Sequence, residues 1–231
     1  MATPDIRRLG HEIKYVLPLH QVGQVAAILG RLCVPDPEYP IGVVASLYFD
    51  TPQLHLLREK MNSDYFKTKV RVRWYEDPAN RRPIGAAYVE SKRRVGTRRF
   101  KVRSPSGRTA AWLATQPLTS LELQRFPDQL RAEGAPLPAP LLPLLEVRYH
   151  RRRYVEPFSG ARIALDADIS TGRCNPSLAT RRSPQTSGRA VLEVKGFDSS
   201  LPPTLRSLGS LGCRRSSFSK YAVCCQALNF V

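Results

Sequence analysis

Three short segments of the chain, residues 68–75, 87–94 and 98–103, carry basic side chains at every second position. On a strand this alternation puts the cations on one face, with a single carboxylate among them: Lys69, Arg71, Arg73, Glu90, Lys92, Arg94, Arg99, Lys101 and Arg103. Two unit charges about 4 Å apart interact by roughly 4 kcal/mol at an effective dielectric constant near 20. Such rows are therefore costly unless they face open water or a strongly anionic ligand.

The chemistry that these residue types suit is phosphate binding. Phosphoryl transfer requires positioning and neutralisation of charge on the phosphate oxygens rather than covalent help. Arg71, Arg73 and Arg151 fit this role because a planar guanidinium can donate two parallel hydrogen bonds to phosphate oxygens. Lys14 and Lys92 would supply compact charges to the same oxygens. A solvated strand face is the alternative interpretation for each of them.

The overall charge points to an anionic partner. The 231 residues include 36 Lys and Arg against 19 Asp and Glu, a net charge of +17, while 42% hydrophobic content is ordinary for a globular protein. This excess indicates nucleic acid, an anionic membrane, a nucleotide or polyphosphate. The five cysteines show no metal-ligand spacing, and no apolar stretch approaches a membrane span. We therefore expect a cytoplasmic protein with reduced thiols and no transmembrane segment.

The periodicity predicts an α+β fold that alternates strands with covering helices. Strands are expected at residues 6–17, 43–50, 68–75, 87–94, 98–103, 144–155, 161–169 and 189–195. Helices are expected at 21–32, from Thr51-Pro52 onward, and at 109–115, 119–132, 201–211 and 219–228; residues 104–107 end a strand, and 170–188 read as a long loop. Eight strands with polar inward positions predict a closed antiparallel β-barrel, a tunnel for a charged ligand. Residues 1–231 would form one such domain.

Eight short motifs occur in order along the chain: Glu12-x-Lys14-Tyr15, Tyr48-Phe49-Asp50-Thr51-Pro52, Lys69-x-Arg71-x-Arg73, Glu90-x-Lys92, Tyr149-x-Arg151, Arg162-x-x-x-Asp166-x-Asp168, Glu193-x-Lys195-Gly196 and Ser219-Lys220-Tyr221. In this order they resemble the VTC domain, the catalytic domain of the vacuolar transporter chaperone complex, within the triphosphate tunnel metalloenzymes. The resemblance covers residues 7–228. It implies an eight-stranded tunnel that binds a nucleoside triphosphate and Mn²⁺ or Mg²⁺. The best-known member transfers the terminal phosphate of ATP to polyphosphate.

The resemblance also implies roles for residues. By this resemblance the catalytic phosphate site would comprise Lys14, Arg71, Arg73, Lys92 and Arg151. Further phosphate or nucleotide contacts are expected from Lys69, Arg99, Lys101, Lys195, Ser219 and Lys220. Lys220 at a helix N-terminus opposes the helix dipole unless an anion is bound there; the alternative is an exposed lysine with Ser219 as the helix cap. A one-residue slip of its strand would exchange Arg99 and Lys101 for their neighbours. Glu193 is the first choice for the metal ligand. Glu12 and Glu90 are weaker candidates, since each could instead pair with a neighbouring lysine, and Asp166 could orient Arg162 or another arginine.

Two departures from the family pattern bear on activity. Hydrolases of the wider superfamily carry ExExK in the first strand, but Gly10 stands at the first acidic position, which argues against a dedicated triphosphatase. A lysine that often precedes the Ser-Lys pair is absent near Ser217, where Arg214 and Arg215 could substitute. The compact, Arg-rich chain is typical of a bacterial, stand-alone version.

The sequence therefore predicts an ATP-dependent polyphosphate polymerase, with ATP and polyphosphate as partners. Two alternatives stay open: a phosphohydrolase of triphosphate or nucleoside triphosphates, and a non-catalytic binder of polyphosphate, inositol phosphate or nucleic acid. Nucleic acid is not expected as the main partner, because groove-binding proteins gather cations on an outer helix or loop rather than alternating them along strands. The oligomeric state is not predicted.

Overall fold

A computed structural model describes residues 11–62, 65–178, 185–196, 198 and 200–230. The chain divides into two compact units. Unit 1 comprises Met1–Ile41, His150–Asp168 and Gly188–Phe218, and unit 2 comprises Gly42–Tyr149, Ile169–Ser187 and Ser219–Val231. The single domain expected over residues 1–231 stays a prediction.

The strands form one sheet in the order β10-β1-β9-β8-β7-β3-β4-β5-β6, with β2 paired to β7. Their bounds are β1 His11–Pro18, β2 Val34–Pro35, β3 Ile41–Asp50, β4 Phe66–Glu76, β5 Pro83–Val95, β6 Arg98–Thr109, β7 Leu142–Val155, β8 Arg162–Cys174, β9 Arg189–Gly196 and β10 Arg214–Arg215. The prediction of eight strands in a closed barrel is wrong. There are ten strands, and over the described residues no pairing joins the edges β10 and β6. The additional β2 and β10 have two residues each, too short to show a period-2 pattern.

The α-helices are α1 Val22–Leu32, α2 His55–Met61, α3 Ala110–Thr115, α4 Leu121–Gln124, α5 Phe126–Ala132 and α6 Lys220–Ala227. Two 3₁₀ helices, η1 Leu19–Gln21 and η2 Pro203–Leu211, join them, so the helix expected at 201–211 is of the tighter kind. The expected start of a helix at Thr51-Pro52 is wrong, because Leu54 has a left-handed φ of 59° and α2 begins only after it. Within the described residues, no helix is long and apolar enough to cross a membrane.

The core of unit 1 follows from the alternation in β1. Ile13, Tyr15 and Leu17 are buried together with Val25 and Leu29 of α1. Full burial of an aliphatic side chain contributes about 1.5–3 kcal/mol, so this apolar face fixes the register of β1. Because side chains alternate along a strand, the intervening even-numbered residues of β1 lie on the opposite face.

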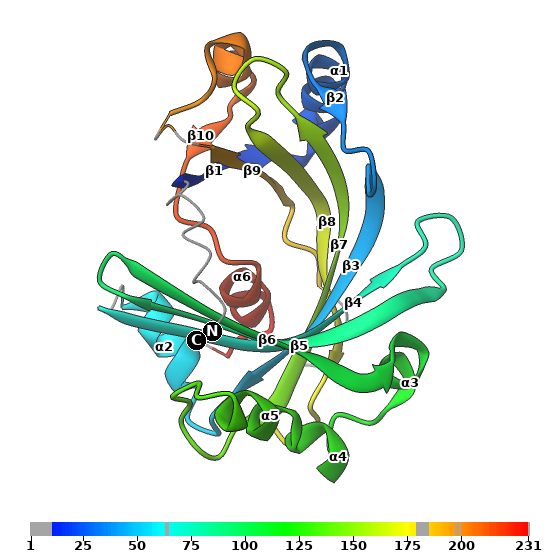
Figure 1. Cartoon of the computed structure of the whole chain (residues 1–231), viewed down its shortest axis with the longest axis vertical. Helices are drawn as coiled ribbons and strands as arrows, with labels where there is room; N and C mark the ends of the chain where they lie inside the picture. The colour runs from blue at the N-terminus through cyan, green and yellow to red at the C-terminus, as the bar shows by residue number, and fades with distance from the viewer. Residues whose placement is uncertain (1–10, 63–64, 179–184, 197, 199, 231) are drawn as a thin grey trace, which may run out of the picture. The chain divides into compact units, whose positions relative to one another are not determined.

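Unit 2 is built on the same principle. Val70, Val72 and Trp74 of β4 are fully buried in a core with side chains from α2, α3 and α5. Figure 1 shows α3, α4 and α5 on one side of β5 and β6 and α6 on the other. The ring of Tyr221 in α6 stacks on Tyr48 of β3, with centroids 4.9 Å apart. The helix α6 therefore packs on the face of the sheet that carries the odd-numbered cations of β4.

Several strands are longer than the sequence predicts, and β6 and β8 show why. β6 continues past residues 104–107 to Thr109, although it contains Pro105. This is possible because β6 is an edge strand, where the missing N–H of a proline interrupts no second ladder. β8 continues to Cys174, and Ser170 forms a bridge with Thr186, so the loop predicted from residue 170 begins later. Residues 179–184 of that predicted loop lie outside the described residues.

Candidate phosphate-binding site

The register of unit 2 aligns the basic side chains in rows across β4, β5 and β6. One row is Lys69–Lys92–Lys101, the next is Arg71–Glu90–Arg103, and a third is Lys67–Arg94–Arg99. The rows are two residues apart along the strands, which corresponds to about 7 Å. The register therefore places Arg99 and Lys101 on the same face as Lys92, as the sequence suggested, rather than their neighbours.

Arg71 and Glu90 form the centre of this basic face. The Nε and Nη2 atoms of Arg71 donate to Oε2 of Glu90 at 2.9 and 2.6 Å, and Nη1 lies 3.3 Å from the hydroxyl of Tyr48. Both charged residues are buried, with 8% and 5% of their surface exposed. Arg103 and Lys101 approach the other oxygen, Oε1 of Glu90, at 3.5 and 4.0 Å. One carboxylate on β5 thus contacts cations on both neighbouring strands, β4 and β6.

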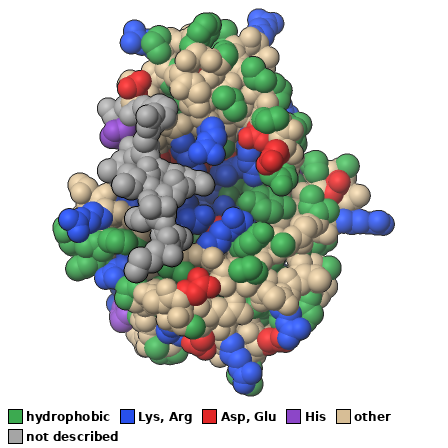
Figure 2. Space-filling view, in the orientation of Figure 1, with side chains coloured by type: hydrophobic (Ala, Val, Ile, Leu, Met, Phe, Trp, Pro, Cys, Tyr) green, Lys and Arg blue, Asp and Glu red, His purple; other side chains and the backbone are tan. Residues whose placement is uncertain are grey.

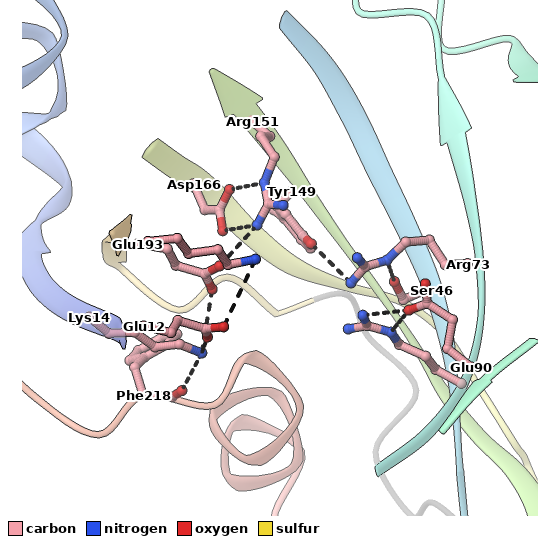
Figure 3. A network of polar contacts seen from close by, with 12 residues as sticks. Glu12, Lys14, Ser46, Arg73, Glu90, Tyr149, Arg151, Asp166, Glu193 and Phe218 are labelled. Carbon is pink, nitrogen blue, oxygen red and sulfur yellow. Dashed lines mark hydrogen bonds and ion pairs between the residues drawn. The ribbon is translucent and has the colours of Figure 1, made fainter. Parts of the chain in front are cut away.

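Arg73 lies beside Arg71 on β4 and is oriented by neutral groups. Its Nε donates to Oγ of Ser46 at 3.2 Å, and its Nη2 contacts the hydroxyl of Tyr149 at 3.4 Å (Figure 3). Neutral partners fix the guanidinium without cancelling its charge. Arg73 is therefore oriented and still positively charged, which is what binding of a phosphate oxygen requires.

The start of α6 also belongs to this basic face. Ser219 caps the helix by accepting from the backbone N–H of Ala222, and Nζ of Lys69 lies 3.0 Å from its Oγ. Lys220 is buried, and its ammonium group lies 4.7 Å from the ring centroid of Tyr149. This cation–π contact offsets part of the cost of placing a cation at a helix N-terminus. The structure thus brings Ser219 and Lys220 to the same face as Arg71 and Arg73.

The pKa values reflect this concentration of positive charge. Burial alone would raise the pKa of the Glu90 carboxyl, but Arg71 and Arg73 lower it to about 2. Burial lowers the pKa of Lys101; Glu90 opposes that shift, and Arg103 adds to it. Figure 2 shows Lys and Arg side chains among apolar ones on the face it draws, in keeping with the net charge of +17. The basic face is thus a surface on which an added anion relieves repulsion.

Unit 1 holds a second set of the predicted residues around Lys14. The ammonium group of Lys14 lies 3.4 Å from Oε1 of Glu193, 3.5 Å from Oε1 of Glu12 and 3.4 Å from the carbonyl oxygen of Phe218 (Figure 3). Strand pairing explains the contacts, because Lys14 is opposite Glu193 and Glu12 is opposite Lys195. Lys195 is exposed and its Nζ is 3.9 Å from Oε2 of Glu12.

Arg151 joins this carboxylate cluster from β7. It makes a two-pronged ion pair with Asp166, with Nε–Oδ1 at 2.6 Å and Nη2–Oδ2 at 2.7 Å, and Nη2 is 3.4 Å from Oε2 of Glu193. Asp166 is fully buried. Of the two options raised by the sequence, Asp166 therefore orients Arg151, and Arg162 lies exposed opposite Lys195. The carboxylate cluster of unit 1 is defined here as Glu12, Lys14, Arg151, Asp166 and Glu193.

The three carboxylates predicted to bind metal differ in how well they suit a divalent cation. Within the described residues, no group of three or more His, Cys, Asp or Glu side chains is arranged so that it could hold a metal ion by itself. A triphosphate-bound Mg²⁺ needs only one or two protein carboxylates, since phosphate and water oxygens complete its shell. Glu193 and Glu12, which both form ion pairs with Lys14, could supply these one or two carboxylates. Glu90 fits poorly, because Arg71 occupies one of its oxygens.

The sequence did not predict which hydroxyl groups orient the guanidinium groups of Arg71 and Arg73. Tyr48 and Ser46 face Arg71 and Arg73 because the β3–β4 register pairs them, and Tyr149 reaches Arg73 across the fold. Tyr48 and Tyr149 belong to two of the eight sequence motifs, but only the structure shows which residues they contact. Of the noted departures, Gly10 lies outside the described residues, whereas Arg214 and Arg215 form β10, paired with β1.

The structure thus shows an antiparallel sheet with flanking helices and ordered rows of Lys and Arg on one face. The model of the VTC domain family matches residues 9–229, and the chain belongs to this family. This membership supports a triphosphate-related enzyme. No curated protein matches the chain.

The fold is similar to that of a solved structure. A protein from Bacillus halodurans described as a "putative adenylate cyclase" has a TM-score of 0.51 and 13% identity, covering 92% of this chain and 94% of its own. One from Vibrio parahaemolyticus with the same description has a TM-score of 0.48 and 12% identity, covering 93% and 96%. At such identities the likeness concerns the fold alone.

Proposed function

We propose that this chain is a polyphosphate polymerase that transfers the terminal phosphoryl group of ATP to the end of a polyphosphate chain. The observation that carries the proposal is the pair Arg71 and Arg73, held side by side on β4 among rows of Lys and Arg from β4, β5 and β6. Membership in the VTC domain family supports the same activity.

The basic face suits a repeating anion. Glu90 and Tyr48 engage three of the five N–H groups of Arg71, so the guanidinium keeps capacity for phosphate oxygens. The row Lys69–Lys92–Lys101 has no carboxylate in its register, whereas the row of Arg71 has one. Successive rows about 7 Å apart match an extended polyanion better than a single phosphate.

The reaction would be a phosphoryl exchange between oxygens. A terminal oxygen of polyphosphate attacks the γ-phosphorus of ATP, the bond from that phosphorus to the β,γ-bridging oxygen breaks, and ADP leaves. Negative charge builds up on the transferred and bridging oxygens. Arg71 and Arg73 would stabilise that charge, and their fixed orientation lowers the reorganisation needed during transfer.

A divalent cation belongs to this proposal. We propose Glu193, with Glu12 beside it, as the carboxylates that would hold Mn²⁺ or Mg²⁺, which neutralises phosphate charge when it is bound. Lys14 lies between these two carboxylates and keeps them from repelling each other.

The test is to incubate the purified protein with ATP and Mn²⁺ and to follow polyphosphate, ADP and free phosphate together. The proposal predicts polyphosphate with stoichiometric ADP, and a fall of about 100-fold or more in the double variant Arg71→Ala/Arg73→Ala. The matched control is Arg31→Ala/Arg125→Ala, which removes two exposed arginines that belong to neither the basic face nor the carboxylate cluster.

The other products would reassign the protein. Free phosphate without polymer would make it a phosphohydrolase. Neither product, together with tight binding of polyphosphate, would make it a non-catalytic polyanion binder. If single-stranded nucleic acid binds more tightly than polyphosphate at equal salt concentration, the basic face is a nucleic-acid-binding surface.

A further inference from the structure

Unit 2 contains a pocket on the opposite face of the sheet from the basic rows. It has a volume of about 470 Å³ and is lined by His55, Arg58, Glu59, Phe66, Thr68, Arg93, Pro136 and Pro138. Its floor is formed by even-numbered residues of β4, which alternate with Lys69 and Arg71 and so point the other way. The volume lies in the range of small-molecule sites.

The pocket lies where the helical cover of unit 2 ends. On this face of β4, Val70 is fully buried and Thr68 is 5% exposed, but Phe66 is 46% exposed. The helix α2 forms one wall, and Pro136 and Pro138, in the segment between α5 and β7, line the pocket as well. An aromatic ring that continues a buried face yet stays half exposed offers a flat apolar surface to a ligand.

The charges of the lining favour an anion. Two guanidinium groups, those of Arg58 and Arg93, are set against one carboxylate, Glu59. That carboxylate already accepts a hydrogen bond from the backbone N–H of Thr68 at 2.6 Å, which ties α2 to β4. The guanidinium carbon of Arg93 lies 5.3 Å from the ring centroid of Phe66. A positive group therefore lies directly beside the exposed ring.

We propose that this pocket binds a small aromatic anion, a flat ring that carries a phosphate or carboxylate group. The ring would lie against Phe66 and the two prolines, and the anionic group would take hydrogen bonds from Arg58 and Arg93. A purely apolar ligand would leave these guanidinium groups desolvated, and a bare phosphate would leave the aromatic surface unused. The site is distinct from the basic face and does not depend on the polymerase activity.

Binding is tested by calorimetry on the full chain carrying Arg71→Ala/Arg73→Ala, which weakens anion binding on the basic face. The probes are AMP and 4-hydroxybenzoate, each of which combines a ring with an anionic group. The comparison compounds are adenosine, which has a ring but no anionic group, and inorganic phosphate, which is an anion without a ring. At least one of the first two should bind at least tenfold more tightly than adenosine or phosphate. AMP alone would identify a phosphate ester as the ligand, and 4-hydroxybenzoate alone a carboxylate.

Substitutions locate the binding. Adding Arg58→Ala or Arg93→Ala should weaken binding of the tighter-binding probe at least tenfold. Adding Arg152→Ala should leave the Kd of that probe unchanged. Arg58 is exposed on α2, so its removal tests the pocket even if Arg93→Ala disturbs the sheet. Equal binding of phosphate and the aromatic anions, absence of binding by all probes, or a Kd insensitive to Arg58→Ala would each overturn the proposal.

Discussion

Replacement of Glu90 by glutamine removes the one carboxylate at the centre of the basic face. The pKa of Glu90 is lowered from an ordinary 4.5 to about 2, because Arg71 and Arg73 outweigh the effect of burial. One pKa unit corresponds to 1.36 kcal/mol, so the ionised carboxylate stabilises the folded chain by about 3 kcal/mol. Its side chain is only 6% exposed, and solvent screening reduces this value little.

The sign of the pH dependence follows from the lowered pKa. A carboxyl whose folded pKa is below its unfolded pKa contributes full stability above pH 4.5 and loses it as the pH falls to about 2. Glu90→Gln should therefore be about 3 kcal/mol less stable than the wild type at pH 7. The difference should shrink steadily between pH 4.5 and 2, since protonated Glu and Gln are both neutral.

Urea unfolding at a series of pH values measures this difference. The control is Glu122→Gln, which removes an exposed carboxylate paired with Arg108 and should cost no more than about 1 kcal/mol. Polyphosphate should restore more stability to Glu90→Gln than to the wild type, because it supplies the missing negative charge. Stability curves for wild type and Glu90→Gln that run parallel from pH 7 to pH 2.5 would refute the electrostatic role of Glu90.

Three further substitutions test other contacts. Tyr221→Phe removes the 2.5 Å hydrogen bond to the buried Asp50 and should lower the free energy of unfolding by about 1–3 kcal/mol, measured by urea titration; no loss would show that this bond is dispensable. Asp166→Ala leaves Arg151 without its two-pronged partner and should cost about 3 kcal/mol or more, whereas a neutral outcome in the same titration would contradict the role assigned to Asp166. Glu193→Gln should raise the Mn²⁺ concentration for half-maximal activity at least tenfold without weakening metal-free binding of polyphosphate; an unchanged Mn²⁺ requirement would remove Glu193 from the metal site.

The period-2 pattern predicted the basic face because burial of the apolar residues of β4 determines which way the basic residues between them point. Val70, Val72 and Trp74 must be buried, and this alone fixes Arg71 and Arg73 on the other face. The same logic placed Glu12 and Lys14 opposite the apolar residues of β1. The family resemblance, based on motifs along the chain, is confirmed by the match over residues 9–229.

The partners within the site could not be predicted in the same way. Whether Asp166 meets Arg162 or Arg151 depends on the packing of β7, β8 and β9 rather than on spacing in the sequence. Contacts such as Tyr149–Arg73 link residues far apart in the chain. The end of β6 was predicted too early because of Pro105. The cost of a proline in a strand depends on whether that strand lies at the edge of the sheet, which only the sheet order reveals.

The most direct test of the central proposal is a single-turnover reaction with γ-³²P-labelled ATP, a polyphosphate primer and Mn²⁺. If the chain is a polyphosphate polymerase, the label appears in the polymer as ADP forms, and Arg71→Ala/Arg73→Ala abolishes the transfer. Label released only as free phosphate, or retained in ATP while polyphosphate binds normally, would contradict polymerase activity.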